Sequence, residues 1–333
     1  MPNSSPPSFA AGGNWLITSA SAKVDLVRRM RQALNAKELR LFSTDQSSLS
    51  AAFHFSDGHF LLPPIESSDF LDQLIATCHA HHIRVLLPTR DADLRFFSAH
   101  RAPLEKAHLW PLVSDSQTID ICLDKIQFDD HCCRHHLPVL PRIHEPTPSV
   151  FPCFVRNRIG SAGHGAQRVP HADAMRILYG PSPWPNLLIQ PCCTDKEYTI
   201  DALFDLDGQP VQWISRERIR TKAGESTVGR TVSIPAIDAL LPSLAHSLHL
   251  IGPATIQVFY SQQNGLHLIE VNPRFGGAAA LGIEAGLDTP RRLVSLAQGD
   301  TEDFLRTRPL EIGMTMLRYS QDIFIHENTT PTT

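Results

Sequence analysis

Short apolar runs alternate with helical spacing in the first third of the chain. Residues 14–20 read NWLITSA, an apolar run typical of a buried strand, and residues 22–36 follow with apolar positions at the spacing of a helix. The same alternation returns downstream as ELRLFST, DFLDQLIATCHAHH and IRVLLPT. Strands that alternate with helices predict a parallel α/β sheet for residues 14–115.

Beyond residue 115 the pattern becomes antiparallel. Asp207–Gly208 and Asn264–Gly265 each separate two strand-like runs, which is a strong local signal of a β-hairpin. Helical spacing is found at the centre of SQTIDICLDKIQFDDHCCRHHL, which stops at Pro138, in HADAMRILYG, which Gly180 closes, and in AIDALLPSLAHSLHL. The chain is therefore expected to place an α/β layer first and an α+β body after it.

Composition and charge narrow the class of protein. The chain has 333 residues, of which 42% are hydrophobic, enough to build two or three domains. A formal charge of -4 gives no reason to expect a nucleic acid or a membrane as partner. No apolar run is long enough to span a bilayer. Residues 1–13 read as a disordered tail without a secretion signal, and the seven cysteines are an odd number, so a reduced, cytoplasmic protein is expected.

A loop of small residues is the first candidate for chemistry. The stretch GSAGHG, residues 160–165, follows a strand that carries Arg156 and Arg158, and the exposed N–H groups of such a loop can cradle phosphate oxygens. By contrast, the turn after the first strand, TSASAKVD, has no glycine, so the Gly-rich dinucleotide fingerprint is absent. Phosphate binding is thus expected in the middle of the chain and not at its first turn.

The second hairpin carries a candidate metal site. Glu270, Asn272 and Arg274 occupy alternate positions in LIEVNPRFGG, so the first two project from one face of the strand. Gln257 lies on the partner strand, and pairing through the turn at Asn264 would bring it close. Three oxygen donors beside an arginine suit Mg²⁺, which takes its remaining ligands from water and phosphates. The alternative is a solvent-facing strand with incidental polar residues, and the following FGG favours the metal site because glycine permits close approach to a ligand.

These motifs resemble the ATP-grasp superfamily, in particular its carboxylate–amine ligases similar to the carbamoyl-phosphate synthetase large subunit. The resemblance rests on LDKIQF, FPCFVRNRIGSAGHG, KEYTIDALFD, IQVFY and LIEVNPRFGGAAALGIEAG, in family order from about residue 14 to 325. It implies an ATP-grasp fold, α/β and α+β, with a Rossmann-like N-terminal domain. The implied division is a tail at 1–13, the N-terminal (pre-ATP-grasp) domain at 14–115, a small lobe at 116–185, a C-terminal lobe at 186–328 and a tail at 329–333.

The resemblance also implies which residues bind ATP. Lys125 and Arg156 would contact its phosphates or the adenine region, and Glu197 would bind the ribose hydroxyls. Relatives usually carry an acidic residue near the adenine where this chain has Gln190 and Pro191, so adenine is expected to rely on a backbone contact or to bind more weakly. The mobile loop over the phosphates would be formed by Gly160, Ser161, Gly163 and Gly165.

For the reaction itself, the resemblance assigns Gln257, Glu270 and Asn272 to one or two Mg²⁺ ions, with Mn²⁺ as a substitute. Arg274 would contact the transferred phosphoryl group. A basic run, SRERIRTKAG, places arginine or lysine at alternate positions. It is either an edge strand facing solvent or part of the active site, in which case Arg218 would hold the substrate carboxylate.

The expected activity is ATP-dependent ligation of a small-molecule carboxylate, such as an amino acid, to an amine through an acyl phosphate, with release of ADP and phosphate. Two alternatives stay open: an enzyme that uses ammonia, a thiol or water as acceptor, and a nucleotide-binding regulator without catalysis. The presence of Glu270, Asn272 and Arg274 favours an active enzyme. A homodimer is the commonest assembly for such enzymes. The cluster His131-Cys132-Cys133 has spacing unsuited to tetrahedral zinc and is interpreted as a helix end.

Overall fold

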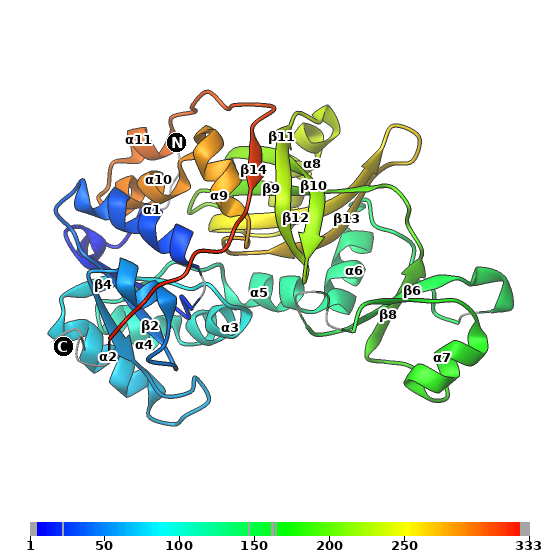
Figure 1. The fold of residues 1–333 in the computed structure, drawn as a ribbon, viewed down its shortest axis with the longest axis horizontal. Helices are drawn as coiled ribbons and strands as arrows, with labels where there is room; N and C mark the ends of the chain where they lie inside the picture. Colours follow the sequence, from blue (N-terminus) through cyan, green and yellow to red (C-terminus); the bar gives the residue numbers. More distant parts are fainter. Residues whose placement is uncertain (1–4, 22, 146, 161–162, 164, 327–333) are drawn as a thin grey trace.

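The computed structural model describes residues 5–21, 23–145, 147–160, 163 and 165–326. Three sheets organise the chain (Figure 1): a parallel sheet near the N-terminus, a large antiparallel sheet in the middle, and a small antiparallel sheet that projects at the end of the molecule away from the first. The expected combination of an α/β layer with an α+β body is confirmed. In the described part of the chain, no helix is both long enough and apolar enough to cross a bilayer.

The N-terminal domain is a five-stranded parallel sheet in the order β3-β2-β1-β4-β5. Its strands are β1 (Asn14–Thr18), β2 (Leu41–Asp45), β3 (Gly58–Leu61), β4 (Ile83–Leu87) and β5 (Trp110–Pro111). The helices between them are α1 (Val24–Asn35), α2 (Phe70–Ala80), α3 (Asp91–Ala99) and α4 (Arg101–Lys106), with a 3₁₀ turn η2 (Ala51–Phe55). The alternation of the sequence is therefore that of a doubly wound layer.

Both faces of this sheet are covered, which explains why β1 is apolar at every position from Trp15 to Ile17. Trp15 and Ile17 point into a core shared with α1, whereas Leu16 points into the opposite core with α2 and α3. The first core also contains Leu293 from α10 (Thr289–Ala297), and α1 packs against that helix. The N-terminal sheet is thereby fixed to the C-terminal part of the chain.

The C-terminal lobe is a six-stranded antiparallel sheet in the order β13-β12-β9-β10-β11-β14. Its strands are β9 (Lys196–Phe204), β10 (Pro210–Lys222), β11 (Glu225–Val232), β12 (Gly252–Ser261), β13 (Gly265–Asn272) and β14 (Thr315–Leu317). One face packs on α5 (Ser116–Leu123), α6 (Lys125–Arg134) and α8 (Pro235–Ser247). The other face meets α9 (Ala279–Gly282) and the π-helix η4 (Ile283–Leu287), and α11 (Thr301–Leu305) follows α10. Both hairpins turn at the predicted glycines.

The small lobe is a three-stranded sheet in the order β7-β6-β8, made of β6 (Cys153–Asn157), β7 (Gln167–Val169) and β8 (Leu187–Pro191). Helix α7 (Ala172–Tyr179) covers it, and a 3₁₀ turn η3 (Pro148–Val150) precedes it. β8 pairs with β6, so LLIQP belongs to this sheet, whereas α5 and α6 pack in the core of the large one. We therefore propose that the small lobe begins after α6 and ends with β8.

Two local interpretations differ from the structure. Residues 8–10 form a 3₁₀ turn, η1 (Ser8–Ala10), in which Ala10 is buried in the first core and Phe9 packs against it, so this turn is not part of a free tail. The basic strand β10 lies between β9 and β11, so the edge-strand interpretation is wrong. The tail at 329–333 lies outside the described residues.

Within β10, Arg216 forms a buried ion pair with Asp201 of β9. Nε and Nη2 of the arginine lie 2.8 and 3.3 Å from the two carboxylate oxygens, and the side chains are 3% and 6% exposed. We expect Arg216→Ala to lower the free energy of unfolding by about 3 kcal/mol, because it leaves an uncompensated carboxylate in the sheet. Urea unfolding measures this.

The matched control is Glu217→Gln, on the next residue of the same strand. Its partner Lys196 is two-thirds exposed, so the unfolding midpoint should hardly move. Replacing both Arg216 and Asp201 by apolar residues of similar size should recover most of the lost stability. A single Arg216→Ala variant as stable as the parent would show that the pair contributes nothing to the fold.

Candidate active site

The β12–β13 hairpin assembles the three predicted metal ligands on one face of the large sheet. The register pairs Gln257 with Glu270 and Thr255 with Asn272, and these side chains point away from α5, α6 and α8. One carboxylate oxygen of Glu270, Oε1, accepts hydrogen bonds from Gln257 Nε2 and from Asn272 Nδ2, each at 3.0 Å. The structure thus brings the three side chains into direct contact.

This donor set fits Mg²⁺. It offers one carboxylate, and each of the two amides can turn its oxygen toward a cation in place of its nitrogen. Magnesium binds through one or two carboxylates and completes its octahedron with water and phosphate oxygens. Among the described residues, no group of three or more His, Cys, Asp or Glu side chains is placed to hold a metal. The hairpin therefore fits a cation that takes its other ligands from water and phosphate oxygens, and not one enclosed by protein side chains.

Arg274 joins this hairpin to the N-terminal domain. Its Nε lies 2.7 Å from Asp91 Oδ1 at the start of α3, and its Nη2 donates to Asn272 Oδ1 at 3.3 Å. Thr255 Oγ1 donates to the carbonyl of Arg274 at 3.2 Å and fixes the turn. Asp91 was not among the predicted residues. Its signal was its place at the start of α3, shortly after β4, because ligands of parallel sheets gather at the carboxyl ends of strands.

Arg156 and Gln190 form one unit between the lobes. Arg156 Nη2 donates to Gln190 Oε1 at 2.8 Å, and its Nη1 donates to the carbonyl of Ile269 on β13 at 3.2 Å. Gln190 is buried and donates in turn to the carbonyl of Leu140 at 3.0 Å. Burial lowers the pKa of Arg156, although the carboxylate of Glu270 opposes that shift. The glutamine side chain is thus engaged in orienting the arginine.

Lys125 contacts Gly160 of the glycine loop and lies near the β12–β13 hairpin, which is called the metal hairpin below after its candidate ligands. Its Nζ donates to the carbonyl of Gly160 at 2.5 Å. Burial lowers the pKa of Lys125, and the negative charges of Glu270 and Asp91 oppose that shift, so its ammonium is near both carboxylates. The structure therefore places Lys125 and Arg156 beside the candidate metal ligands, although they come from α6 and β6.

The loop after β6 depends on glycine. Gly160, Gly163 and Gly165 have φ angles of +143°, +72° and +72°, a region that other residues rarely adopt. At Gly165 a Cβ would also lie 2.2 Å from Nδ2 of Asn157. Ser161, the fourth predicted member of the loop, lies outside the described residues.

Glu197 and Arg218 pair with each other across β9 and β10. Arg218 Nε lies 3.1 Å from Glu197 Oε1, and its Nη2 donates to the carbonyl of Gly224 at 2.8 Å in the hairpin tip. Burial raises the pKa of Glu197, and Arg218 opposes that shift. Glu270 raises the same pKa, which places this ion pair near the metal hairpin. Glu197, which was predicted to bind the ribose, and Arg218, which was predicted to hold the substrate carboxylate, therefore form one ion pair.

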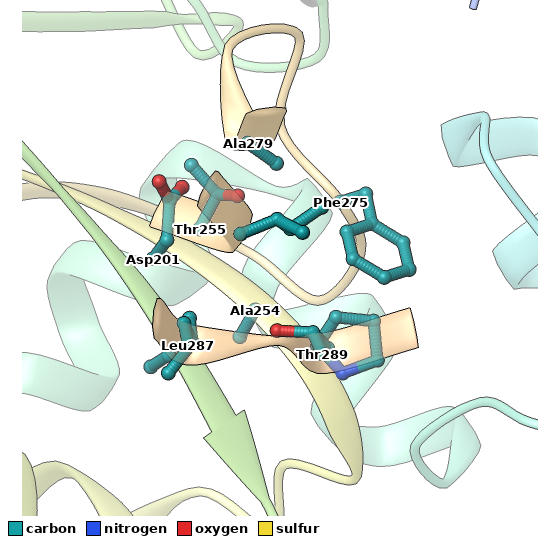
Figure 2. Close-up of a pocket in the computed structure, with 10 residues that line it drawn as sticks. Asp201, Ala254, Thr255, Phe275, Ala279, Leu287 and Thr289 are labelled. Carbon is teal, nitrogen blue, oxygen red and sulfur yellow. The ribbon is translucent and has the colours of Figure 1, made fainter. Parts of the chain in front are cut away.

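The cavity in Figure 2 is not a substrate site. It lies beneath the turn that follows Arg274, and its volume of about 10 Å³ is room for roughly one water molecule. The FGG motif also packs on the protein itself. A Cβ on Gly276 would lie 2.7 Å from Thr255 Oγ1, and one on Gly277 would lie 2.4 Å from Glu225 Oε1. Close approach is required here as predicted, but the groups approached are side chains.

The His-Cys stretch does not converge on one point. Cys132 is buried in the core of the large lobe, whereas its neighbour Cys133 is exposed at the end of α6. His131 stacks at a tilt on His135 with ring centroids 4.4 Å apart, and burial lowers the pKa of His131 to about 4. Successive positions on a helix face different directions, which explains this divergence.

Comparison with known proteins gives matches in both halves of the chain. Residues 15–111 match the family model "PylC-like, N-terminal domain", and residues 184–316 match "ATP-grasp in the biosynthetic pathway with Ter operon". No curated protein matches the chain by sequence.

Solved structures share the fold. A biotin carboxylase from Campylobacter jejuni, in complex with β,γ-ATP, superposes with a TM-score of 0.68 at 10% identity, over 91% of this chain and 74% of that one. An N5-carboxyaminoimidazole ribonucleotide synthetase from Thermotoga maritima gives 0.64 at 13%, over 91% and 79%. An L-amino acid ligase from Bacillus licheniformis gives 0.66 at 15%, over 89% and 78%. The predicted resemblance is therefore confirmed at the level of domains: residues 15–111 match a PylC-like N-terminal domain, and residues 184–316 match an ATP-grasp domain.

Proposed function

We propose that this protein is an ATP-dependent ligase that joins a small-molecule carboxylate, an amino acid or a related metabolite, to an amine through an acyl phosphate. The observation that carries the proposal is the assembly of Gln257, Glu270 and Asn272 on one sheet face, in hydrogen-bond contact with Arg274. A nucleotide-binding protein without catalysis has no need to keep these four groups together.

The chemistry follows from the charges. A carboxylate oxygen attacks the γ-phosphorus of ATP and ADP leaves, and the amine nitrogen then attacks the acyl carbon, releases phosphate and loses a proton. Phosphoryl transfer depends on alignment and on neutralising oxygen charge. Arg274 and Arg156 contact the metal hairpin and Lys125 lies near Glu270, so all three supply positive charge there. Mg²⁺, held by the Glu270 group, would supply further neutralisation when bound.

One structure with this fold is named an L-amino acid ligase and another an N5-carboxyaminoimidazole ribonucleotide synthetase. Identities of 13–15% support the fold alone, so the reaction is proposed from the site residues. The ion pair of Glu197 and Arg218 lies near Glu270, so Arg218 can reach a substrate carboxylate by exchanging its partner. We propose this role for Arg218, and ATP phosphate contacts for Lys125 and the glycine loop.

The proposal is tested by following ADP and phosphate release with ATP and Mg²⁺ over a panel of carboxylates crossed with amines. Release should require one member of each class, and mass spectrometry should find the amide. With hydroxylamine as amine, the correct carboxylate should give a hydroxamate, the product expected of an acyl phosphate. Product formation with ammonia or a thiol alone would redirect the acceptor class, and phosphate release with a carboxylate but no acceptor would contradict ligation.

A further inference from the structure

Lys23 is a cation without a carboxylate partner at the junction of the two domains. It lies after β1 and caps α1, and its side chain is half-buried. Its Nζ donates to the carbonyl and to the hydroxyl of Thr89 at 3.0 and 2.9 Å, both neutral acceptors. Among the described residues, no carboxylate lies within ion-pair distance of it. An ammonium has three N–H donors, so one remains unused.

The nearest acids are already engaged. Asp93 is buried and accepts hydrogen bonds from Thr18 Oγ1 at 2.7 Å and from Ser19 Oγ at 3.0 Å. Glu225 pairs with Arg318 at 2.7 Å, and Asp91 pairs with Arg274. The carboxylates facing Lys23 therefore do not cancel its charge through direct contact.

Lys23 and Arg274 both bind the segment that follows the carboxyl end of β4. Thr89, which accepts from Lys23, stands two residues before Asp91, which binds Arg274. The two cations are close enough for Arg274 to lower the pKa of Lys23, which burial brings to about 8, and exposed Arg90 acts in the same direction. Two cations that repel each other are both stabilised by an anion that binds close to them.

We propose that Lys23 binds the carboxylate of the substrate, on the N-terminal side of the junction and opposite Arg274. This inference rests on the proposed function and adds a specificity residue from the N-terminal domain. It identifies the ligand class as a carboxylate small enough to lie between the ammonium of Lys23 and the guanidinium of Arg274. Lys23 would thereby bind the carboxylate that is phosphorylated, and Arg218, which lies near Glu197, would bind a second carboxylate group of the substrates.

Steady-state kinetics test the proposal with Lys23→Met, which keeps the length of the side chain and removes its charge. The KM for the carboxylate should rise about 10- to 100-fold, the loss expected for one charge-assisted hydrogen bond. The KM values for ATP and for the amine should stay within about threefold of the parent. Lys23→Arg keeps the charge and should recover most of the affinity, and the matched control Lys37→Met, at an exposed position after α1, should change nothing. Equal carboxylate KM values for Lys23→Met and the parent would overturn the proposal.

A second measurement separates this proposal from the ligase activity itself. Acetate binding to the nucleotide-free protein is followed by NMR after reductive ¹³C-methylation of the lysines, with neutral acetamide as comparison. One dimethyl-lysine signal, missing in Lys23→Met, should shift with acetate and not with acetamide. A shift in that signal supports the site even if no amide product is found in the panel. No shift with acetate, or the same shift with acetamide or chloride, would overturn it.

Discussion

Arg274→Ala is expected to lower turnover by about 10³-fold, the scale of loss when an arginine that stabilises a transferring phosphoryl group is removed. The affinity for ATP should change far less, by about threefold, because Lys125, Arg156 and the glycine loop would still contact the nucleotide. The large expected effect on turnover follows from the position of the Arg274 guanidinium. Arg274 donates to Asn272 and binds Asp91 through Nε, so its guanidinium is held at the metal hairpin before substrate arrives.

Single-turnover ADP formation and calorimetric ATP binding measure the two effects separately. Arg274→Lys restores the charge without the planar fork and should recover only part of the rate. Arg306→Ala is the matched control, because Arg306 is an exposed arginine that pairs with Glu302 on the surface. Undiminished turnover of Arg274→Ala, in a protein with an unchanged unfolding midpoint, would remove Arg274 from the reaction.

The parts of the fold that follow a local period could be predicted from the sequence. The run from Trp15 to Ile17 is buried on both faces, and the helical spacing of α1 places Val27, Met30 and Leu34 on its buried side. The two hairpins follow from Asp207–Gly208 and Asn264–Gly265, since those dipeptides favour tight turns. Period-two spacing also placed Glu270 and Asn272 on one face, where the structure finds them in contact.

What escaped prediction depends on which segments lie side by side. LLIQP reads as a strand, but its sequence does not show that it pairs with β6 across a helix and a loop. Likewise, β10 has the alternation of an edge strand, yet β9 and β11 flank it and Arg216 is buried. The period of a strand shows which side chains share a face of the sheet, but it does not show which strands lie on either side.

The same limit explains the missed site residues. Asp91 binds Arg274 from 183 positions away, and Lys23 reaches the junction through Thr89, 66 positions away. Neither pair has a spacing that a periodic pattern encodes. A general rule would have found both candidates, because each follows a parallel strand at its carboxyl end. Applying it required knowing that this edge faces the ATP-grasp body.

Glu270→Gln tests the other half of the site, the cation. The substitution keeps the size of the side chain and an oxygen that can accept from Gln257 and Asn272, so the hairpin should fold as before. It removes the one carboxylate of the donor set, and a site of three amide side chains without an acid has little affinity for Mg²⁺. We expect turnover to fall about 10²- to 10³-fold, since metal neutralisation of phosphoryl oxygens contributes several kcal/mol.

Titration of Mg²⁺ distinguishes a lost cation from a distorted site. In Glu270→Gln, half-maximal turnover should require at least about tenfold more Mg²⁺, whereas ATP binding without metal should match the parent. Glu302→Gln, an exposed acid on α11, should leave both quantities unchanged. If Glu270→Gln reached full turnover at the parent's Mg²⁺ concentration, the hairpin would be a polar surface and not a metal site. Because Arg274 donates to Asn272 and Asn272 donates to Glu270, that result would also remove the geometric reason for placing phosphoryl transfer beside Arg274.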